Sequence, residues 1–376
     1  MIEPQLFVEE LAKQGTEFFT GVPDSLLKSL CAYITDSVDD EHHIIAANEG
    51  NAVALGCGTY LATGRIPLVY MQNSGEGNAV NPLLSLADED VYQIPLLLVM
   101  GWRGEPGIAD EPQHKKQGKV TLPLLEAMGI PYEVLSEERE EVKKQITKAY
   151  KSMKDNLSPY ALIVRKNLFA EYKLKSSTQP AGVMSREEAI DCIVSNSSDS
   201  SIFVATTGMA SRELYEIREK RGQSHESDFL TVGSMGHTSQ IALGIALVRK
   251  EREVYCLDGD GANLMHLGGM AIIGSKKPQN YCHIILNNGS HDSVGGQPTV
   301  GRAIKLAEVA LALGYESAIQ VSTQQELEAA LNKQGGGLRC IEVLVKRGNR
   351  KDLGRPKSTP IENKHAFMRY IAEGMK

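Results

Sequence analysis

The sequence has few features of secreted, thiolate-metal or membrane proteins. Its six cysteines are scattered over 376 residues and include no C-x-x-C pair, which argues against a disulfide framework, a zinc site and an iron–sulfur cluster. No run of about eighteen apolar residues could span a bilayer. Met1-Ile2-Glu3-Pro4 begins neither a basic nor an apolar leader. We therefore expect a cytoplasmic protein that does not associate with membranes.

Nucleotide-binding loops and an excess of positive charge are also absent. Gly56-Cys57-Gly58, Gly75-Glu76-Gly77 and Gly259-Asp260-Gly261 all lack the third glycine of G-x-G-x-x-G. The only Gly-Lys pair, Gly118-Lys119, lacks the rest of a Walker A loop. A formal net charge of −7 argues against nucleic-acid binding. The motifs disfavour NAD and ATP, and the charge means that an anionic substrate would need a locally basic pocket.

Short apolar runs alternate with amphipathic stretches in both halves of the chain, a pattern typical of parallel strands with covered faces. We predict two doubly wound parallel-sheet α/β domains, residues 1–171 and 184–376, joined by the polar segment 172–183, with no inserted middle domain. The predicted strands are 18–22, 44–47, 66–71, 94–100, 132–135 and 161–164 in the first half, and 202–205, 229–232, 254–257, 281–286, 318–321 and 340–345 in the second.

Two polar turns in the second half suggest a site for a metal ion and a diphosphate. Asp260 follows one predicted strand and precedes a helical pattern through Ile273, whereas Asn287-Asn288-Gly289 closes the next strand. Both turns therefore lie at the carboxyl edge of one parallel sheet. Mg²⁺ accepts a carboxylate, an amide oxygen, a backbone carbonyl and phosphate oxygens. The alternative, two hairpin turns, requires strands on both sides of each turn.

Gly-Asp-Gly with a downstream Asn-Asn resembles the signature of thiamine diphosphate enzymes. Motifs over nearly the whole chain resemble the thiamine diphosphate-dependent 2-oxoacid decarboxylases, especially the phosphonopyruvate decarboxylases and the related sulfopyruvate decarboxylases. The resemblance implies pyrimidine-binding (PYR) and diphosphate-binding (PP) domains, thiamine diphosphate and Mg²⁺ as cofactors, and a homo-oligomer with active sites between subunits. The segments that carry it are 21–28, 73–82, 110–114, 288–299 and 352–356.

Glu49 is the predicted catalytic acid. It follows the predicted strand 44–47 and begins the helical stretch from Ala52 to Leu61. The resemblance implies that this carboxyl hydrogen-bonds the cofactor's pyrimidine ring and activates the cofactor. The alternative is a solvated glutamate that stabilises a helix N-terminus.

Further residues of the second half are predicted to hold the cofactor. Thr206-Thr207-Gly208 joins a strand to a helix and suits a diphosphate, although a simple cap would look the same. The resemblance implies that the Gly233 carbonyl contacts the pyrimidine and that Met235 is an apolar wedge that bends the cofactor. The alternative for Met235 is an ordinary core residue. The resemblance also implies the carbonyl of Ser290 as a metal ligand beside Asp260 and Asn288. The remaining implied cofactor contacts are Asn73, Gly259, Gly261, Ala262, Asn263, Asn288 and Ser290.

Candidates for the substrate anion lie in both halves. They are Asp24 with Ser25, His114, His291 and the basic arm 346–355. Most charges of the arm fit a solvated tail, but Arg350 and Arg355 are predicted substrate ligands because arginine pairs bidentately with a phosphonate. His114 and His291 are candidates for proton transfer, with an ordinary surface position as the alternative for His114.

The resemblance implies decarboxylation of 3-phosphonopyruvate to 2-phosphonoacetaldehyde and CO₂ in phosphonate biosynthesis. Sulfopyruvate decarboxylase is the leading alternative. A thiamine diphosphate-dependent oxidoreductase or carboligase is another, although the oxidoreductases usually need an iron–sulfur or flavin partner, against which the missing C-x-x-C speaks. A non-catalytic binding protein of the same fold would have no need for Glu49.

Overall fold

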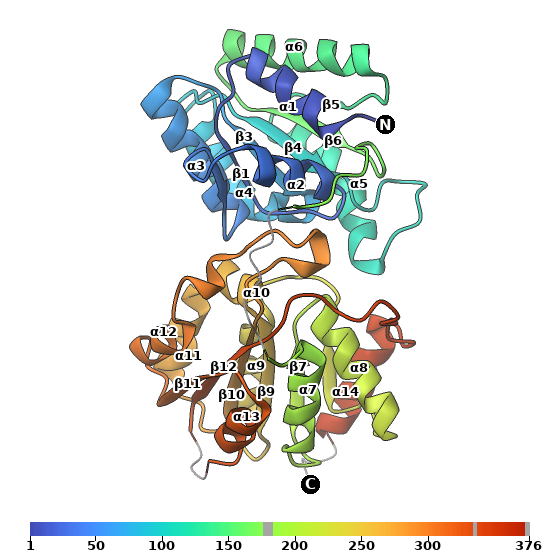
Figure 1. Cartoon of the computed structure of the whole chain (residues 1–376), viewed down its shortest axis with the longest axis vertical. Helices are drawn as coiled ribbons and strands as arrows, with labels where there is room; N and C mark the ends of the chain where they lie inside the picture. The colour runs from blue at the N-terminus through green and yellow to red at the C-terminus, as the bar shows by residue number, and fades with distance from the viewer. Residues whose placement is uncertain (176–182, 334–336, 373–376) are drawn as a thin grey trace. The chain divides into compact units, whose positions relative to one another are not determined.

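The computed structural model describes residues 1–175, 183–333 and 337–372 (Figure 1). The chain forms two compact units. Unit 1 is Met1–Thr178 with His291–Gln297, and unit 2 is Gln179–Ser290 with Pro298–Lys376. Of the predicted linker 172–183, residues 176–182 lie outside the described residues. Each unit contains one parallel six-stranded sheet with helices on both faces, which confirms the predicted doubly wound α/β class.

The sheet of unit 1 has the strand order β2-β1-β3-β4-β6-β5, and every pairing is parallel. Each of the six predicted runs of the first half overlaps one strand. The strands are β1 (Phe19–Gly21), β2 (His43–Ile45), β3 (Leu68–Gln72), β4 (Leu97–Gly101), β5 (Tyr132–Val134) and β6 (Tyr160–Val164).

Alternating side chains of the unit 1 strands enter two separate cores. Leu68 and Tyr70 of β3 face the core covered by α1, α2 and α6, whereas Val69 and Met71 face the core covered by α3, α4 and α5. The helices are α1 (Pro4–Lys13), α2 (Lys28–Ser37), α3 (Glu49–Thr63), α4 (Glu76–Pro82), α5 (Pro112–Ala127) and α6 (Arg139–Asn156), with short helical turns η1 (Asn73–Gly75) and η2 (Leu83–Ala87).

The sheet of unit 2 has the order β11-β12-β10-β9-β7-β8, also parallel throughout. Each of the six predicted runs of the second half also overlaps one strand. The strands are β7 (Ile202–Ala205), β8 (Asp228–Leu230), β9 (Val254–Gly259), β10 (Tyr281–Asn287), β11 (Ser317–Val321) and β12 (Arg339–Leu344).

Helices α7, α8 and α13 share one core of unit 2, and α9, α11, α12 and α14 share the other. The helical pattern predicted to follow Gly261 through Ile273 corresponds to two helices, α10 and α11, which are separated by His266 and Leu267. Gly268 and Gly269 follow the break, where low helix propensity favours it. The bounds are α7 (Arg186–Ser195), α8 (Met209–Arg221), α9 (Thr238–Val248), α10 (Asp260–Met265), α11 (Gly268–Lys276), α12 (Leu306–Ala312), α13 (Gln324–Leu331) and α14 (Pro360–Ala372), with short turns η3 (Asp292–Val294) and η4 (Val300–Arg302).

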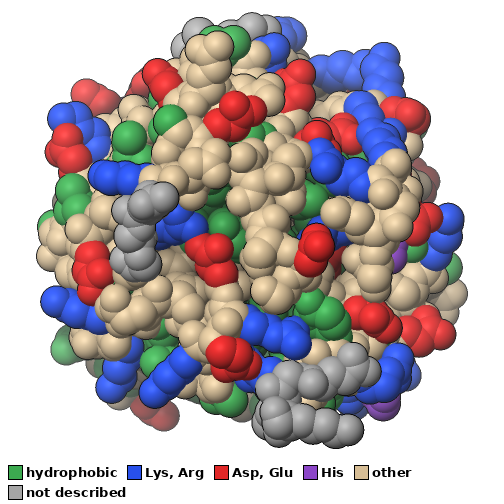
Figure 2. Space-filling model, turned by 90° about the horizontal axis from the view of Figure 1, so that it is seen from below, with side chains coloured by type: hydrophobic (Ala, Val, Ile, Leu, Met, Phe, Trp, Pro, Cys, Tyr) green, Lys and Arg blue, Asp and Glu red, His purple; other side chains and the backbone are tan. Residues whose placement is uncertain are grey.

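Two general properties of the molecule bear on its partners. No helix in the described ranges is both long enough and apolar enough to cross a membrane. Figure 2 shows Lys and Arg side chains interspersed with Asp and Glu side chains on the face that it draws.

Candidate functional site

Glu49 lies just after β2 and is the first residue of α3. The Asn48 side chain caps this helix by accepting a hydrogen bond from the Gly50 amide at 2.8 Å. Only 5% of Glu49 is exposed, so the alternative of a solvated glutamate is wrong. Burial raises the pKa of its carboxyl, while a hydrogen bond from Asn78 Nδ2 to Oε2, 2.7 Å long, opposes that rise. The side chain is therefore held in place and favours its protonated form more than an exposed glutamate does.

The segment 73–78 wraps around this carboxyl. A Cβ at Gly75 would collide with the Glu49 carboxylate, so only glycine allows so close an approach. Asn73, predicted to contact the cofactor, is buried and bonds within unit 1. Its Nδ2 donates to the Arg103 carbonyl at 2.8 Å and to Thr121 Oγ1 at 2.9 Å. The described contacts of Asn73 therefore position the Gly75 turn beside Glu49.

Asp24 and Ser25 belong to a hydrogen-bonded network at the carboxyl edge of the unit 1 sheet. Asp24 is buried and accepts from Gln72 Nε2 at 2.5 Å. Burial raises the pKa of Asp24, and the hydrogen bond from Gln72 opposes the rise. Ser25 Oγ accepts from Arg103 Nη1 at 2.8 Å, and Asp110 holds the same guanidinium at 2.8 and 2.5 Å. The sequence reasoning missed Gln72 and Arg103, although both stand at or just after the end of a predicted strand.

His114 lies in the first turn of α5 and is 8% exposed, so the alternative of an ordinary surface position is wrong. Its Nδ1 is buried and has no hydrogen-bond partner among the residues that the structure describes. Burial lowers the pKa of the imidazole, and the nearby Arg103 lowers it further. His114 therefore favours the neutral ring, which can accept a proton or a hydrogen bond.

The predicted metal ligand Asp260 is the first residue of α10 and is 2% exposed. The Thr299 hydroxyl donates to Asp260 Oδ2, and Gly301 approaches so closely that a Cβ there would lie 2.5 Å from the same oxygen. Burial raises the pKa of Asp260 to about 6, and the hydrogen bond from Thr299 opposes the rise. Thr299 was not predicted, and only its place in the motif 288–299 could have pointed to it.

The two asparagines after β10 have different surroundings. Asn287 is buried, and its Nδ2 donates to the Gly301 carbonyl and to Glu342 Oε1, each at 2.7 Å. Asn288 Oδ1 accepts from the Ser290 amide at 3.0 Å, which holds the turn in a fixed shape. The structure thus brings Asp260, Asn288 and Ser290 to the carboxyl ends of the adjacent strands β9 and β10.

Several polar atoms of unit 2 are buried without a hydrogen-bond partner in the described part of the chain, and those at predicted cofactor residues are Thr206 Oγ1, Asn263 Oδ1 and Ser290 Oγ. Leaving buried polar groups unsatisfied is costly, so such groups indicate a place for a polar ligand. Thr207 and Gly208 directly precede the thirteen-residue helix α8, whose first amides suit an anion. Gly259, Gly261 and Ala262 surround Asp260 in the chain. These residues fit a Mg²⁺-bound diphosphate in their chemistry.

The loop between β8 and α9 contains Gly233 and Met235, which are both half-buried. Met235 belongs to neither hydrophobic core of unit 2, so the alternative of core filler is wrong for this residue. Ser234, which lies between them, has a backbone φ of +56°, a left-handed conformation that is uncommon for serine. A strained loop whose apolar side chain, Met235, is not part of a hydrophobic core suits a binding role.

His291 belongs to the short segment of unit 1 that follows Ser290. Its backbone amide donates to the Gln297 carbonyl at 2.9 Å. Burial lowers the pKa of its imidazole to about 4, although Asp292 opposes that shift. His291 is therefore neutral near pH 7 and can accept, but not readily supply, a proton.

Of the two arginines predicted in the basic arm, Arg350 is paired with carboxylates. Arg350 forms ion pairs with Glu187 at 3.0 Å, with Glu216 and with Asp352 at 3.1 Å. Its charge is already balanced, which opposes the predicted contact with a substrate phosphonate. Arg355 is exposed.

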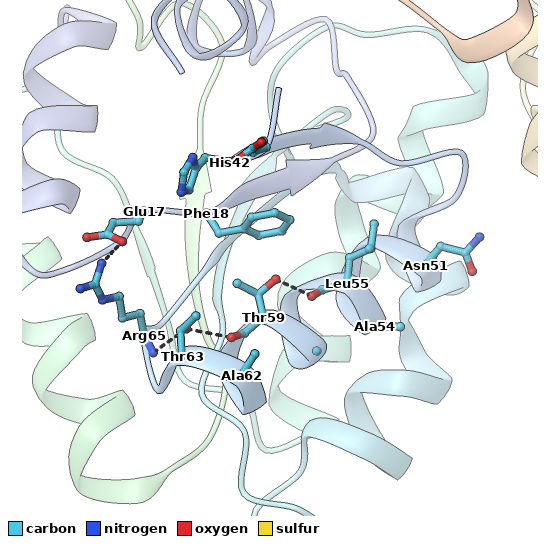
Figure 3. A pocket seen from close by; sticks show the side chains of 12 residues that line it. Glu17, Phe18, His42, Asn51, Ala54, Leu55, Thr59, Ala62, Thr63 and Arg65 are labelled. Carbon is cyan, nitrogen blue, oxygen red and sulfur yellow. Dashed lines mark hydrogen bonds and ion pairs between the residues drawn. The ribbon is translucent and has the colours of Figure 1, made fainter. Parts of the chain in front are cut away.

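A surface pocket of about 750 Å³ in unit 1 lies along the outward side of α3 (Figure 3). Leu55 and Phe18 line it, and the ion pair of Glu17 with Arg65 lies at one side. It contains none of the predicted site residues. The pocket therefore offers apolar surface but no group that could perform the predicted chemistry.

Comparison with known proteins identifies the family of the chain. Residues 4–122 match the N-terminal, and residues 204–343 the C-terminal, TPP binding domain of thiamine pyrophosphate enzymes. A phosphonopyruvate decarboxylase of Streptomyces viridochromogenes is 31% identical over 388 aligned residues, covering 99% of this chain and 95% of that protein. One of Streptomyces hygroscopicus is 31% identical with the same coverage of both chains.

A sulfopyruvate decarboxylase of Methanosarcina acetivorans is 29% identical over 378 aligned residues, covering 93% of both chains. The matches to phosphonopyruvate decarboxylases extend over nearly the whole chain and exceed 30% identity. The chain therefore belongs to the thiamine pyrophosphate enzymes and is a decarboxylase of the group that contains the phosphonopyruvate and sulfopyruvate decarboxylases.

Proposed function

We propose that the protein decarboxylates 3-phosphonopyruvate to 2-phosphonoacetaldehyde and CO₂, with thiamine diphosphate and Mg²⁺, as a step of phosphonate biosynthesis. The observation that carries this choice is the full-length similarity to two phosphonopyruvate decarboxylases at 31% identity. The reaction exchanges the substrate's carboxylate for a proton. The bound cofactor supplies the electron sink for that exchange.

The residues of unit 1 would handle protons and orient the reactants. Glu49, whose pKa is raised by burial, would hold a proton against the cofactor's pyrimidine ring. His114 and His291 are the candidates to move a proton at the substrate, since burial favours their neutral forms. Asp24 and Ser25 would orient the substrate through the network that Arg103 holds.

The residues of unit 2 would hold the cofactor. Asp260, Asn288 and the carbonyl of Ser290 would ligate Mg²⁺. Thr206, Thr207 and Gly208 would bind the diphosphate beside Gly259, Gly261, Ala262 and Asn263, and Gly233 with Met235 would contact the pyrimidine. Support comes from the buried, unpartnered atoms Thr206 Oγ1, Asn263 Oδ1 and Ser290 Oγ in the described residues.

We also propose a homo-oligomer in the cytoplasm. Glu49 and Asp260 belong to different units, and the family resemblance places such half-sites in different subunits. The six cysteines are all buried free thiols, which agrees with a reducing compartment.

Sulfopyruvate decarboxylation is the second candidate, supported by the relative that is 29% identical over 93% of the chain. The two substrates differ in the charge of the terminal group, because a phosphonate can carry two negative charges and a sulfonate only one. Turnover of both acids by the same preparation would separate the two functions.

The deciding experiment incubates the purified full-length protein with thiamine diphosphate and Mg²⁺ and measures CO₂ and aldehyde. Phosphonopyruvate, sulfopyruvate and pyruvate are tested in parallel, with EDTA and cofactor omission as controls. We expect the highest kcat/KM with phosphonopyruvate. A higher kcat/KM with sulfopyruvate would transfer the assignment, and no turnover of any 2-oxoacid would refute it.

A further inference from the structure

Two arginines of unit 2 meet at the turn that follows β10. Arg347, just after β12, donates from Nη2 to the Gly289 carbonyl at 3.0 Å. Arg302, the last residue of η4, packs its Cγ against the same Gly289 and donates from Nη2 to the Val345 carbonyl at 2.8 Å. Gly289 stands between the proposed metal ligands Asn288 and Ser290. The Arg347 guanidinium and the aliphatic part of the Arg302 side chain therefore flank the loop that we propose to hold Mg²⁺.

The hydrogen-bonding capacity of these two side chains is largely unused. The Nε atoms of Arg302 and Arg347 are buried and lack hydrogen-bond partners within the described ranges. Neither guanidinium forms an ion pair with a carboxylate in that part of the chain, in contrast to Arg350. A guanidinium offers five N–H donors, and leaving buried donors unmatched is costly. The unmatched N–H donors of Arg302 and Arg347 therefore need a hydrogen-bond acceptor.

The surrounding charges make that acceptor an anion. Arg302 and Arg347 both lie at Gly289, and the hydrogen bonds described above join each of them to a main-chain carbonyl rather than to a carboxylate. Glu342 is already engaged by Asn287 at 2.7 Å and by Gln320 at 3.0 Å. Asp260 accepts a hydrogen bond from the Thr299 hydroxyl. Neither carboxylate is then available to neutralise the arginine pair.

We propose that Arg302 and Arg347 form a binding site for a phosphate-type oxyanion, either the cofactor's diphosphate or the substrate's phosphonate. Two neighbouring guanidinium forks match the several oxygens of a tetrahedral oxyanion better than the two oxygens of one carboxylate. The choice between the two sources rests on the proposed function, whereas the oxyanion site itself does not. The recognition of the anion moves from Arg350 to Arg347, three residues earlier in the same arm.

The test uses the full-length protein and four variants, Arg302→Gln, Arg347→Gln, Arg302→Lys and Arg347→Lys. Lys305→Gln is the matched control, because it removes a positive charge from the same segment at a side chain that is 74% exposed. Calorimetry measures binding of inorganic pyrophosphate and of thiamine diphosphate, each with Mg²⁺. Steady-state kinetics measure KM for phosphonopyruvate and kcat/KM for pyruvate, and thermal melts check folding.

Two outcomes support the site and identify its ligand. Weakening of pyrophosphate and thiamine diphosphate binding by about tenfold or more in the glutamine variants, the loss expected for charge-assisted hydrogen bonds, assigns the pair to the diphosphate. Unchanged cofactor binding with a comparable rise in KM for phosphonopyruvate, and unchanged kcat/KM for pyruvate, assigns it to the phosphonate. The lysine variants should fall between the wild type and the glutamine variants, because they keep the charge but lose the fork.

Other outcomes overturn the site. If both glutamine variants match Lys305→Gln within about twofold in every binding constant and KM, the arginines have no ligand. If even the lysine variants fail to fold, the pair is structural. Pyrophosphate binding is read without turnover, so an absence of decarboxylase activity in the wild type would refute the proposed function but leave this measurement valid.

Discussion

Burial at the start of α3 changes which protonation state Glu49 prefers. Glu49→Gln keeps the shape and the hydrogen bond from Asn78 but cannot exchange a proton. We expect thiamine diphosphate to remain bound while kcat falls by about a hundredfold or more, the loss typical of a removed acid–base group. Calorimetry and steady-state kinetics provide the two measurements. Glu89→Gln, at an exposed position of the same unit, is the control, and near-normal turnover of Glu49→Gln would contradict the role.

Glu76 predicts a pH dependence of stability. It is 2% exposed, its Oε1 has no hydrogen-bond partner in the described part of the chain, and burial raises its pKa to about 8. Because the folded-state pKa lies above the ordinary value of 4.5, its contribution to stability is complete below pH 4.5 and is lost as pH rises through about 8. The loss is at most about 1.4 kcal/mol per pH unit in that window.

Glu76→Gln should remove this part of the pH dependence, because glutamine does not titrate. Urea unfolding of wild type and variant at several pH values between about 5 and 9 gives the comparison, and the variant should gain on the wild type toward the alkaline end. Parallel stability curves for the two proteins would show that Glu76 ionises normally. Glu89→Gln again controls for the loss of one carboxylate.

Glu49 and Asp260 could be predicted from the sequence because each follows an apolar run and precedes a helical stretch. In a parallel α/β sheet, a residue between a strand and a helix lies at the edge of the sheet. It could not reveal that Arg350 is neutralised by Glu187 and Glu216, since those partners lie more than a hundred residues away. The burial of His114 was equally hidden. Its polar neighbours in sequence resemble a surface helix, and only packing in unit 1 decides its exposure.

At the scale of whole elements, many candidate site residues lie at or after the carboxyl ends of strands. All twelve predicted apolar runs overlap a strand, because a strand buried on both faces has an apolar sequence. The break between α10 and α11 was not predicted, since apolar residues continue through Ile273 and only the glycines at 268 and 269 mark it. Short helices after buried strands thus remain harder to delimit than the strands themselves.

Gly301 gives a prediction for the loop that follows η3. Gly301→Ala would place a Cβ 2.5 Å from Asp260 Oδ2 and 3.0 Å from Asn287 Oδ1, so the carboxylate must move. We expect weaker Mg²⁺-dependent binding of thiamine diphosphate, by about tenfold or more, because ligand geometry around Mg²⁺ tolerates little displacement. Gly268→Ala, where a Cβ meets nothing within 4 Å, is the control. Equal cofactor affinity in both variants would exclude steric coupling to Asp260.

At the scale of the whole molecule, the proposed shared site predicts complementation. Glu49→Gln and Asp260→Ala should each be inactive alone, but subunit exchange creates mixed oligomers in which one site regains both groups. We therefore expect part of the wild-type activity to return after mixing under conditions that permit exchange. Exchange is verified with differently tagged chains. Demonstrated exchange without recovered activity would count against a site formed by two subunits.

The assignment of residues His291–Gln297 to unit 1 has a consequence for biosynthesis. The ribosome synthesises the amino-terminal part of a chain first, so both cores of unit 1 can form before unit 2 is synthesised. The seven residues of this returning segment emerge only after more than a hundred further residues. A nascent chain stalled before His291 would therefore carry a unit 1 that lacks this segment, although Asn288 and Ser290 would already have been synthesised.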